Sequence, residues 1–146
     1  MAYRVNGGPL WQLLQSFADS MMIECRQWIA NGWDFPNIEK DWGQSDWYYY
    51  EETYGFRATY NDASEIGQQS SRHYHEHADN YFIMISGTIA VSVADNDIEF
   101  LSDGDVFCVP HGQHHHFTVV EPAVFVEIYL SPIGKPLADV DIVRLN

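Results

Sequence analysis

The 146-residue chain is long enough for one domain with a substantial core, and 46% of its residues are apolar. Seven basic and 21 acidic residues give a formal net charge of −14, which argues against nucleic acid and anionic membranes as partners. No apolar run approaches the roughly 20 residues of a membrane-spanning helix, and the N-terminus has no apolar signal core. With only two cysteines, we expect a cytoplasmic protein with reduced thiols.

The first predicted element is an amphipathic α-helix over residues 9–30. Apolar residues recur along it at helical spacing, Pro9 suits a first helical turn, and Gly32 follows the end. Residues 31–46 show no clear period and are interpreted as an irregular connector that contains Trp33 and Trp42. We expect residues 1–46 to pack on a barrel formed by residues 47–146, within one structural domain.

The rest of the chain alternates strand-like segments with turn residues. A hairpin is predicted from residues 47–53 and 56–60, with its turn at Tyr54-Gly55. Further strands are expected at 81–86, 88–94, 98–101, 105–109, 115–120 and 123–130, with breaks at Gly87 and Glu121-Pro122. Turn signals at intervals of roughly 8–12 residues are typical of a β-sandwich or barrel.

All seven histidines lie in two clusters, HYHEH at 73–77 and HGQHHH at 111–116. On a strand, side chains two residues apart share a face, so His73, His75 and His77 would point the same way. Imidazole is a good ligand for zinc, iron, copper and nickel. Two histidines of one strand and a third from a facing strand would bind a metal and leave positions open for water or substrate.

The residues around these clusters fall at regular spacings: Gly67, His73, His75 and Gly87 for the first, and Gly104, Pro110, Gly112 and His115 for the second. This pattern resembles the two motifs of the cupin superfamily, G-x5-H-x-H-x3,4-E-x6-G and G-x5-P-x-G-x2-H-x3-N. The resemblance covers roughly residues 60–130. It implies an all-β double-stranded β-helix, the jelly-roll or cupin barrel, here with an N-terminal α-helix. It also implies His73, His75 and His115 as metal ligands.

Two positions depart from the family pattern. Asn80 stands where the family has a glutamate ligand, and Val119 where it has an asparagine. Asp79 would restore a carboxylate if the loop were one residue shorter. A second register, in which His75 and His77 are the ligands, is similar to the cupin domain of bacterial mannose-6-phosphate isomerases. Both registers stay open, and His75 is a ligand in each.

A site of neutral ligands leaves a bound ion with more net charge than a site that includes a glutamate. One divalent transition metal (Fe, Mn, Zn or Ni) would then act as a Lewis acid on a small organic molecule, in isomerase, epimerase or lyase chemistry. The alternatives are a three-His Fe(II) dioxygenase and a non-enzymatic cupin that binds a small ligand.

An enzyme of this kind also needs groups that transfer protons, and Glu127, Tyr81 and Tyr60 are the candidates. Glu127 shares a strand face with Tyr129 and would point either into the barrel or to solvent. Arg57, Arg72 and Arg144 are the only arginines near the barrel elements, so phosphate binding has little support. Exposed strand edges and the apolar stripe of the helix predict a two-fold homodimer.

Overall fold

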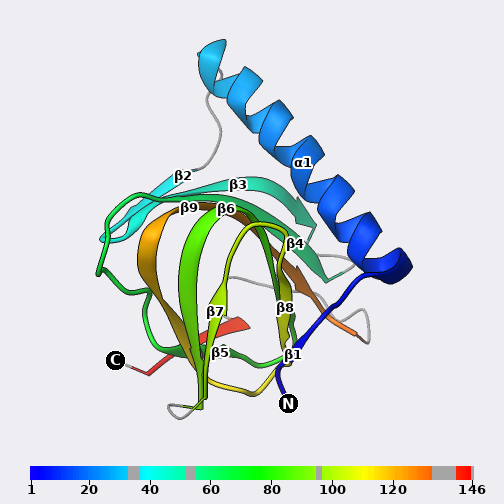
Figure 1. The fold of residues 1–146 in the computed structure, drawn as a ribbon, viewed down its shortest axis with the longest axis vertical. Helices are drawn as coiled ribbons and strands as arrows, with labels where there is room; N and C mark the ends of the chain where they lie inside the picture. The colour runs from blue at the N-terminus through cyan, green and yellow to red at the C-terminus, as the bar shows by residue number, and fades with distance from the viewer. Residues whose placement is uncertain (33–36, 52–54, 95–96, 133–140, 146) are drawn as a thin grey trace.

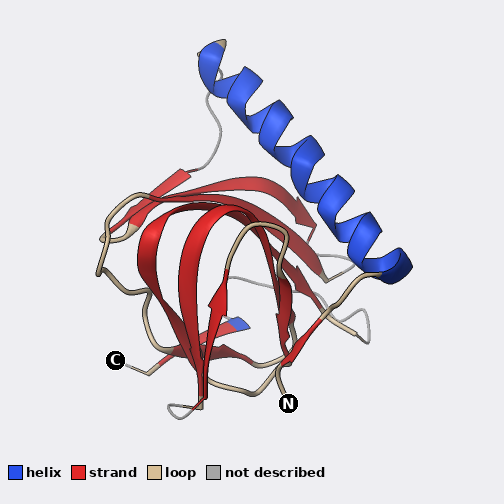
Figure 2. Cartoon of the chain, viewed as in Figure 1, coloured by secondary structure: helices blue, strands red, loops and turns tan. Residues whose placement is uncertain are grey.

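The computed structural model describes residues 1–32, 37–51, 55–94, 97–132 and 141–145. Figure 1 shows one helix lying across a barrel of strands, and Figure 2 shows that strands dominate the rest. The elements are β1 (Tyr3–Arg4), α1 (Gly8–Ala30), β2 (Asn37–Lys40), β3 (Gly43–Glu51), β4 (Phe56–Ala63), β5 (His73–His75), β6 (Asp79–Val93), β7 (Asp97–Leu101), β8 (Val106–Val109), β9 (His115–Leu130) and β10 (Ile142–Arg144).

The strands form two antiparallel layers that share β6 and β9. One layer has the order β8-β6-β9-β4-β3-β2, with β1 beside β8. The other layer is built from β7, β6, β9, β5 and β10. The first half of β6 pairs with the second half of β9 in one layer, and the remaining halves pair in the other. This arrangement confirms the predicted all-β jelly roll with an N-terminal helix.

The two long strands bend where the sequence suggested that strands end. The register of β6 against β9 shifts between Met84 and Ile89, which marks irregular pairing. Gly87 lies at this bend with a φ of 76°, and a Cβ there would overlap the carbonyl oxygen of Pro122. The breaks predicted at Gly87 and Glu121-Pro122 are therefore bulges within continuous strands. Irregular pairing lets one strand serve both layers.

The region interpreted as an irregular connector contains strands. β2 and the start of β3 form a hairpin, with Asn37 opposite Asp46 and Lys40 opposite Gly43. Trp42 in the turn is 6% exposed and packs edge-on against Phe117, with ring centroids 5.0 Å apart. The short strand β2 gives no periodic signal of its own, and pairing with β3 imposes its extended form. Trp33 lies outside the described residues.

The predicted hairpin over residues 47–60 is present as β3 and β4, which pair from Gln44↔Asp62 to Glu51↔Phe56. Tyr54 of the predicted turn lies outside the described residues, and Gly55 follows with a φ of 68°.

The helix α1 begins at Gly8 and ends at Ala30, close to the predicted 9–30. Its buried side chains recur three or four residues apart and are Leu14, Ala18, Met21 and Cys25. They pack on the outward-facing side chains Ala58, Ile83 and Val126 of the first layer. Hydrophobic burial of this stripe holds the helix on the barrel. Across the described parts of the chain, no helix has the length and apolar character needed to cross a membrane.

Aromatic rings fill the space between the two layers. Trp42, Phe82, Phe117 and Phe125 lie with ring centroids 5.0–6.4 Å apart, mostly edge to face. Next to this cluster the inner face becomes polar, and the ring of Phe82 lies 6.1 Å from that of His115. The aromatic cluster therefore forms an apolar floor beneath the histidines.

Candidate metal centre and its cavity

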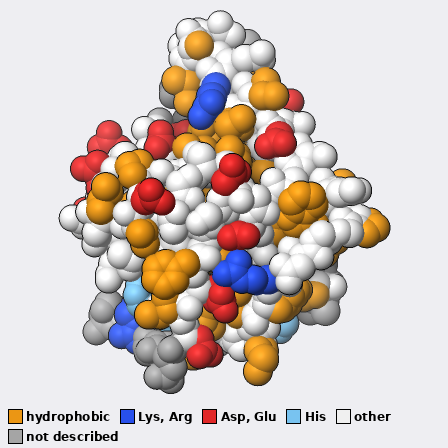
Figure 3. All heavy atoms as spheres, viewed as in Figure 1, with side chains coloured by type: hydrophobic (Ala, Val, Ile, Leu, Met, Phe, Trp, Pro, Cys, Tyr) orange, Lys and Arg blue, Asp and Glu red, His pale blue; other side chains and the backbone are white. Residues whose placement is uncertain are grey.

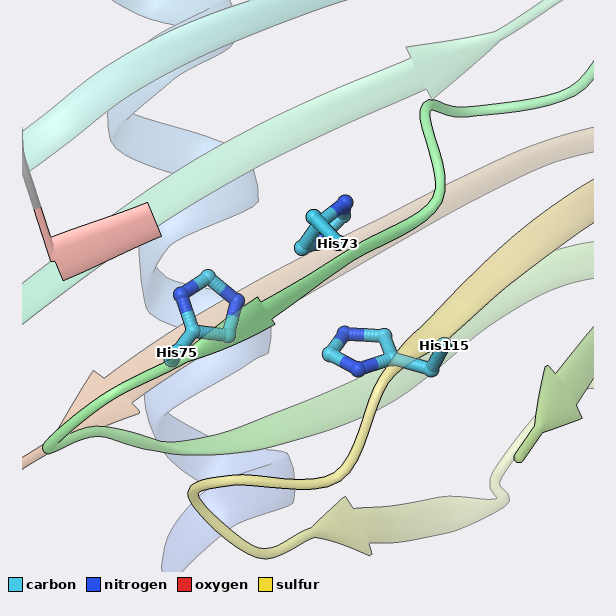
Figure 4. A group of neighbouring side chains, drawn as sticks. All are labelled: His73, His75 and His115. Carbon is cyan, nitrogen blue, oxygen red and sulfur yellow. The ribbon is translucent and has the colours of Figure 1, made fainter. Parts of the chain in front are cut away.

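Three buried histidines converge between β5 and β9. His73 and His75 share one face of β5, and His115 lies directly opposite His73 at the start of β9. Figure 4 shows the three rings grouped together from these two strands. One ring nitrogen of each lies within 4.8 Å of the others. Three atoms this close to one another lie within about 2.8 Å (4.8/√3) of a common point, so small inward shifts of the three nitrogens would give metal–nitrogen bonds of about 2.0–2.1 Å.

Backbone carbonyls fix the tautomer of two of the rings. Nδ1 of His73 donates to the Ser71 carbonyl at 2.7 Å, and Nδ1 of His115 donates to the Gln113 carbonyl at 3.0 Å. Each Nε2 therefore carries a lone pair. Such a bond on the distal nitrogen is the usual way in which proteins orient a metal-binding histidine.

Two features of the site fit a bound cation. Neither ring nitrogen of His75 has a hydrogen-bond partner among the described residues, although the side chain is 2% exposed. The Nε2 lone pair of His115 faces the Asn80 Oδ1, another acceptor, at 3.1 Å. Rotation of the Asn80 amide would relieve the second contact, and a slight closure toward Asp141 would give Nδ1 of His75 a partner, which leaves its Nε2 for an ion. Buried polar atoms are rarely left without a partner, so an ion is a suitable occupant.

Burial keeps the three rings neutral. Loss of water contact lowers the pKa of His73 to about 3, helped by the neighbouring His115 and by the charges of Arg144 and Lys40. Burial likewise lowers the pKa of His115 to about 4 and that of His75 well below its usual value. Neutral imidazole is the form that binds a metal, so the ligands are ready at neutral pH.

A buried carboxylate lies behind His75. Asp141 is 4% exposed, and its Oδ1 accepts the backbone N–H of His77 at 3.0 Å. Its Oδ2 has no hydrogen-bond partner in the described chain and lies 3.7 Å from Nδ1 of His75. A slight closure would let Nδ1–H donate to this oxygen and turn Nε2 toward the other two histidines.

The site opens into a cavity of about 570 Å³. His73 and His115 line it together with Glu127, Tyr129 and Arg57. This volume is within the usual range of small-molecule sites.

Glu127 is the buried acid of this cavity. It is 6% exposed, and it accepts hydrogen bonds from the Tyr129 hydroxyl at 2.8 Å and from Asn61 Nδ2 at 3.4 Å. Burial raises the pKa of its carboxyl group, while hydrogen bonds from Tyr129 and Asn80 and the charge of Arg57 act in the opposite sense. Arg57 itself lies over the Tyr129 ring, 4.7 Å from its centroid. Of the two orientations left open by the sequence, Glu127 takes the inward one.

Other predicted site residues lie outside the triad. His77 is half-buried, with Nε2 3.7 Å from Glu76, and it is not part of the cluster. The Oδ1 of Asp79 accepts the backbone N–H of the exposed His111 and lies 2.9 Å from its Nδ1. Asn80 is fully buried beside His115 but offers only an amide. The geometry thus groups the histidines of the first register.

The two tyrosine candidates lie on the wrong face of the barrel to reach the cavity. Tyr60 is buried beneath α1, where its hydroxyl oxygen accepts a hydrogen bond from Nε of Arg26 at 3.3 Å. Tyr81 packs in the same layer, beside Tyr3. Neither lines the cavity. Strand alternation explains this, because their neighbours Thr59 and Phe82 face the cavity instead.

Sequence reasoning overlooked two polar residues of the site, Asp141 and Lys40, and it gave Arg144 no role there. Asp141 and Arg144 belong to a segment that pairs with β5, and Lys40 belongs to β2. Only the pairing of strands far apart in the sequence brings them to the histidines.

Comparisons with known proteins support the fold. Residues 64–129 match the model of the cupin domain family. KdgF from Halomonas sp. superposes with a TM-score of 0.60 at 20% identity, over 75% of this chain and 94% of that one. Oxalate decarboxylase from Bacillus subtilis gives 0.63 at 17% identity, over 77% of this chain and 30% of that one. This chain thus spans about a third of that protein's length.

A Streptomyces PAC13 variant with uridine gives a TM-score of 0.63 at 12% identity, over 77% of this chain and 85% of that one. A comparison with curated proteins finds no match by sequence. At these identities the solved structures show a shared fold and no shared reaction. The family match identifies a cupin domain over residues 64–129, and the solved structures show that the chain has the fold of this superfamily.

Proposed function

We propose that His73, His75 and His115 hold one divalent transition metal, Fe, Mn, Zn or Ni, and that the site acts on a small organic molecule in isomerase, epimerase or lyase chemistry. The observation that carries this proposal is Glu127, a buried carboxyl group with a raised pKa in the same cavity as the histidines. A metal site without such a group would bind a molecule but would lack a means of moving its protons.

The bound ion would supply Lewis-acid polarisation of a carbonyl or hydroxyl oxygen. Glu127 would take a proton from carbon or oxygen of the substrate and return it at another position. Its raised pKa suits this role, because a carboxyl group closer to neutrality both accepts and releases a proton readily. The hydrogen bond from Tyr129 holds one carboxylate oxygen in place and leaves the other, held by Asn61, as the proton acceptor.

Two alternatives have specific support. Three nitrogen ligands without a carboxylate also suit an Fe(II) dioxygenase, because the ion then keeps more charge and open positions. A non-enzymatic cupin that binds a small ligand would use the same cavity without proton transfer. Metal analysis of protein purified without an affinity tag separates them in part, because iron favours oxygen chemistry and zinc, manganese or nickel favours Lewis-acid chemistry.

The test compares Glu127→Gln with Glu121→Gln. Both residues lie on β9 and accept a hydroxyl hydrogen bond, but Glu121 is exposed and bonds Thr88. Metal-loaded protein is incubated in D₂O with small hydroxy and keto acids, and deuterium uptake at carbon is followed by NMR. We expect Glu127→Gln to retain metal and to lose exchange by a factor of 100 or more, roughly the value of general acid–base catalysis. Equal exchange in the two variants would refute the role of Glu127.

We also propose that the chain forms a two-fold homodimer through α1. The helix leaves four large apolar side chains exposed, Leu10, Leu13, Ile23 and Ile29, and Leu13 is 66% exposed. Figure 3 shows apolar side chains on the surface in the region of the helix. A two-fold pair through α1 would cover exposed apolar side chains of both copies.

A further inference from the structure

Positive charge gathers in the cavity of an otherwise acidic chain. The sequence contains only seven lysines and arginines, and three of them, Lys40, Arg57 and Arg144, line the cavity. They belong to β2, β4 and β10, so the folded sheet assembles them from distant parts of the chain. A chain with a net charge of −14 repels anions at long range, and a local group of cations would offset that field.

Strand pairing places Arg144 beside the metal ligands. Arg144 on β10 is the direct partner of His73 on β5, and His73 is the direct partner of His115 on β9. Directly opposed residues of antiparallel strands project to the same face, with Cβ atoms about 4.5–5.5 Å apart. The three side chains thus form a row across the sheet that runs from the triad to the cavity mouth.

Lys40 joins Arg144 at this mouth. Apart from burial, the charge of Arg144 is the main cause that lowers the pKa of Lys40, and both cations act on His73. Two like charges repel each other, and in the described chain neither side chain makes an ion pair or a hydrogen bond that would offset this. An anion bound between Lys40 and Arg144 would offset this repulsion.

Three acids, Glu39, Asp41 and Glu127, also line the cavity, so its net charge depends on the protonation of Glu127. Glu39 and Asp41 are exposed to solvent, as are Lys40 and Arg144. Glu127 is the buried acid, and the uncharged form of its carboxyl group is favoured by burial. The inner part of the cavity is therefore most positive when Glu127 holds its proton.

We infer that the substrate is a small molecule with an acidic group, a carboxylate or a phosphate, which Lys40 and Arg144 bind while another oxygen faces His73, His75 and His115. This inference rests on the proposed function of the site. Arginine suits the role because its planar guanidinium binds two oxygens of either acid. Lys40 adds a second charge, and Arg57 lies deeper, over Tyr129.

The test measures binding by calorimetry with three probes: succinate, phosphoglycolate and the neutral succinamide. The protein is the full chain, titrated both metal-loaded and metal-free. We expect an acidic probe to bind at least about tenfold more tightly than succinamide, and comparison of succinate with phosphoglycolate shows whether replacing one carboxylate by a phosphate strengthens binding. In the double variant Lys40→Gln/Arg144→Gln this preference should fall about tenfold, because two solvent-exposed ion pairs to the acidic group are lost together.

Arg72→Gln is the matched control, because Arg72 is exposed, precedes β5 directly and does not line the cavity. It should leave the affinities unchanged, and all variants should keep the wild-type metal content. Equal binding of succinate and succinamide, or an equal loss in Arg72→Gln and the double variant, would overturn the inference. Absence of stoichiometric metal in the wild type would instead overturn the proposed function, and the metal-free titrations would still test the two cations.

Discussion

Replacing Asp141 by Asn tests whether the buried carboxylate behind His75 supports the metal site. The substitution preserves shape and leaves an oxygen to accept the His77 backbone N–H, but it removes the negative charge. If a metal binds Nε2 of His75, Nδ1 must carry the proton, and the Asp141 Oδ2 is the acceptor that faces it. We therefore expect the variant to fold normally and to bind metal more weakly.

The structure sets the size of this effect. The ion would lie at most about 8 Å from the Asp141 Oδ2. This distance combines the 3.7 Å from Oδ2 to Nδ1 of His75, the width of the ring and one metal–nitrogen bond. Charges of +2 and −1 at that distance attract by about 4 kcal/mol at an effective dielectric constant of about 20. Partners that orient ligating histidines are typically worth about 10–100-fold in affinity, or about 1.4–2.8 kcal/mol. We expect a loss of affinity in that range.

Asp79→Asn is the matched control for this measurement. Asp79 also accepts a backbone N–H and contacts a histidine, but that histidine is His111, which lies outside the triad. Zinc dissociation constants are measured by competition with a chromogenic chelator, on protein without an affinity tag. Equal affinities of the two variants would show that the charge of Asp141 does not reach the site.

Three further outcomes are expected. His115→Ala should remove most bound metal and His111→Ala little, as measured by mass spectrometry, and equal losses would mean that the histidine-rich loop binds metal nonspecifically. Light scattering at micromolar concentration should give about twice the chain's 16.8 kDa, and deletion of residues 1–30 should dissociate the dimer or make the protein insoluble. A mass of 16.8 kDa, or an intact soluble dimer after deletion, would contradict the role of the helix. The metal-free protein should lose stability as the pH falls from about 6.5 toward 4, because the unfolded chain protonates three histidines that stay neutral when folded. The three histidines alone would give the free energy of unfolding a slope of up to about 4 kcal/mol per pH unit near pH 5, and the raised pKa of Glu127 reduces this slope. A urea midpoint that does not change with pH would refute this.

Local periodicity and motif spacing were sufficient to predict much of the fold. The helical spacing of Leu14, Met21 and Cys25 predicted α1, and the spacing of His73, His75 and His115 predicted which side chains would meet. These signals work because each depends on the geometry of one element or on the resemblance to one family.

Residues that reach the site through distant pairing could not be predicted in this way. Asp141 and Arg144 contribute through the register of β10 against β5, and that register has no local signal in the sequence. The choice of Tyr81 failed for a different reason. Side chains alternate along β6, so Tyr81 points outward because its neighbour Asn80 points inward. The alternation rule that was used for the histidines would have predicted this for β6.

The strands shared by both layers have a consequence for the order of folding. β6 and β9 pair along most of their length, and His115 lies within this ladder opposite Val93, so we expect the ladder to form before His115 has a defined position. β5 joins β9 at one residue pair only, so it gains little until the β6–β9 ladder exists. Such non-local pairing folds slowly, on the scale of about milliseconds to seconds. We expect metal ions to enter a barrel that has already formed, so that refolding rates should be the same with and without metal.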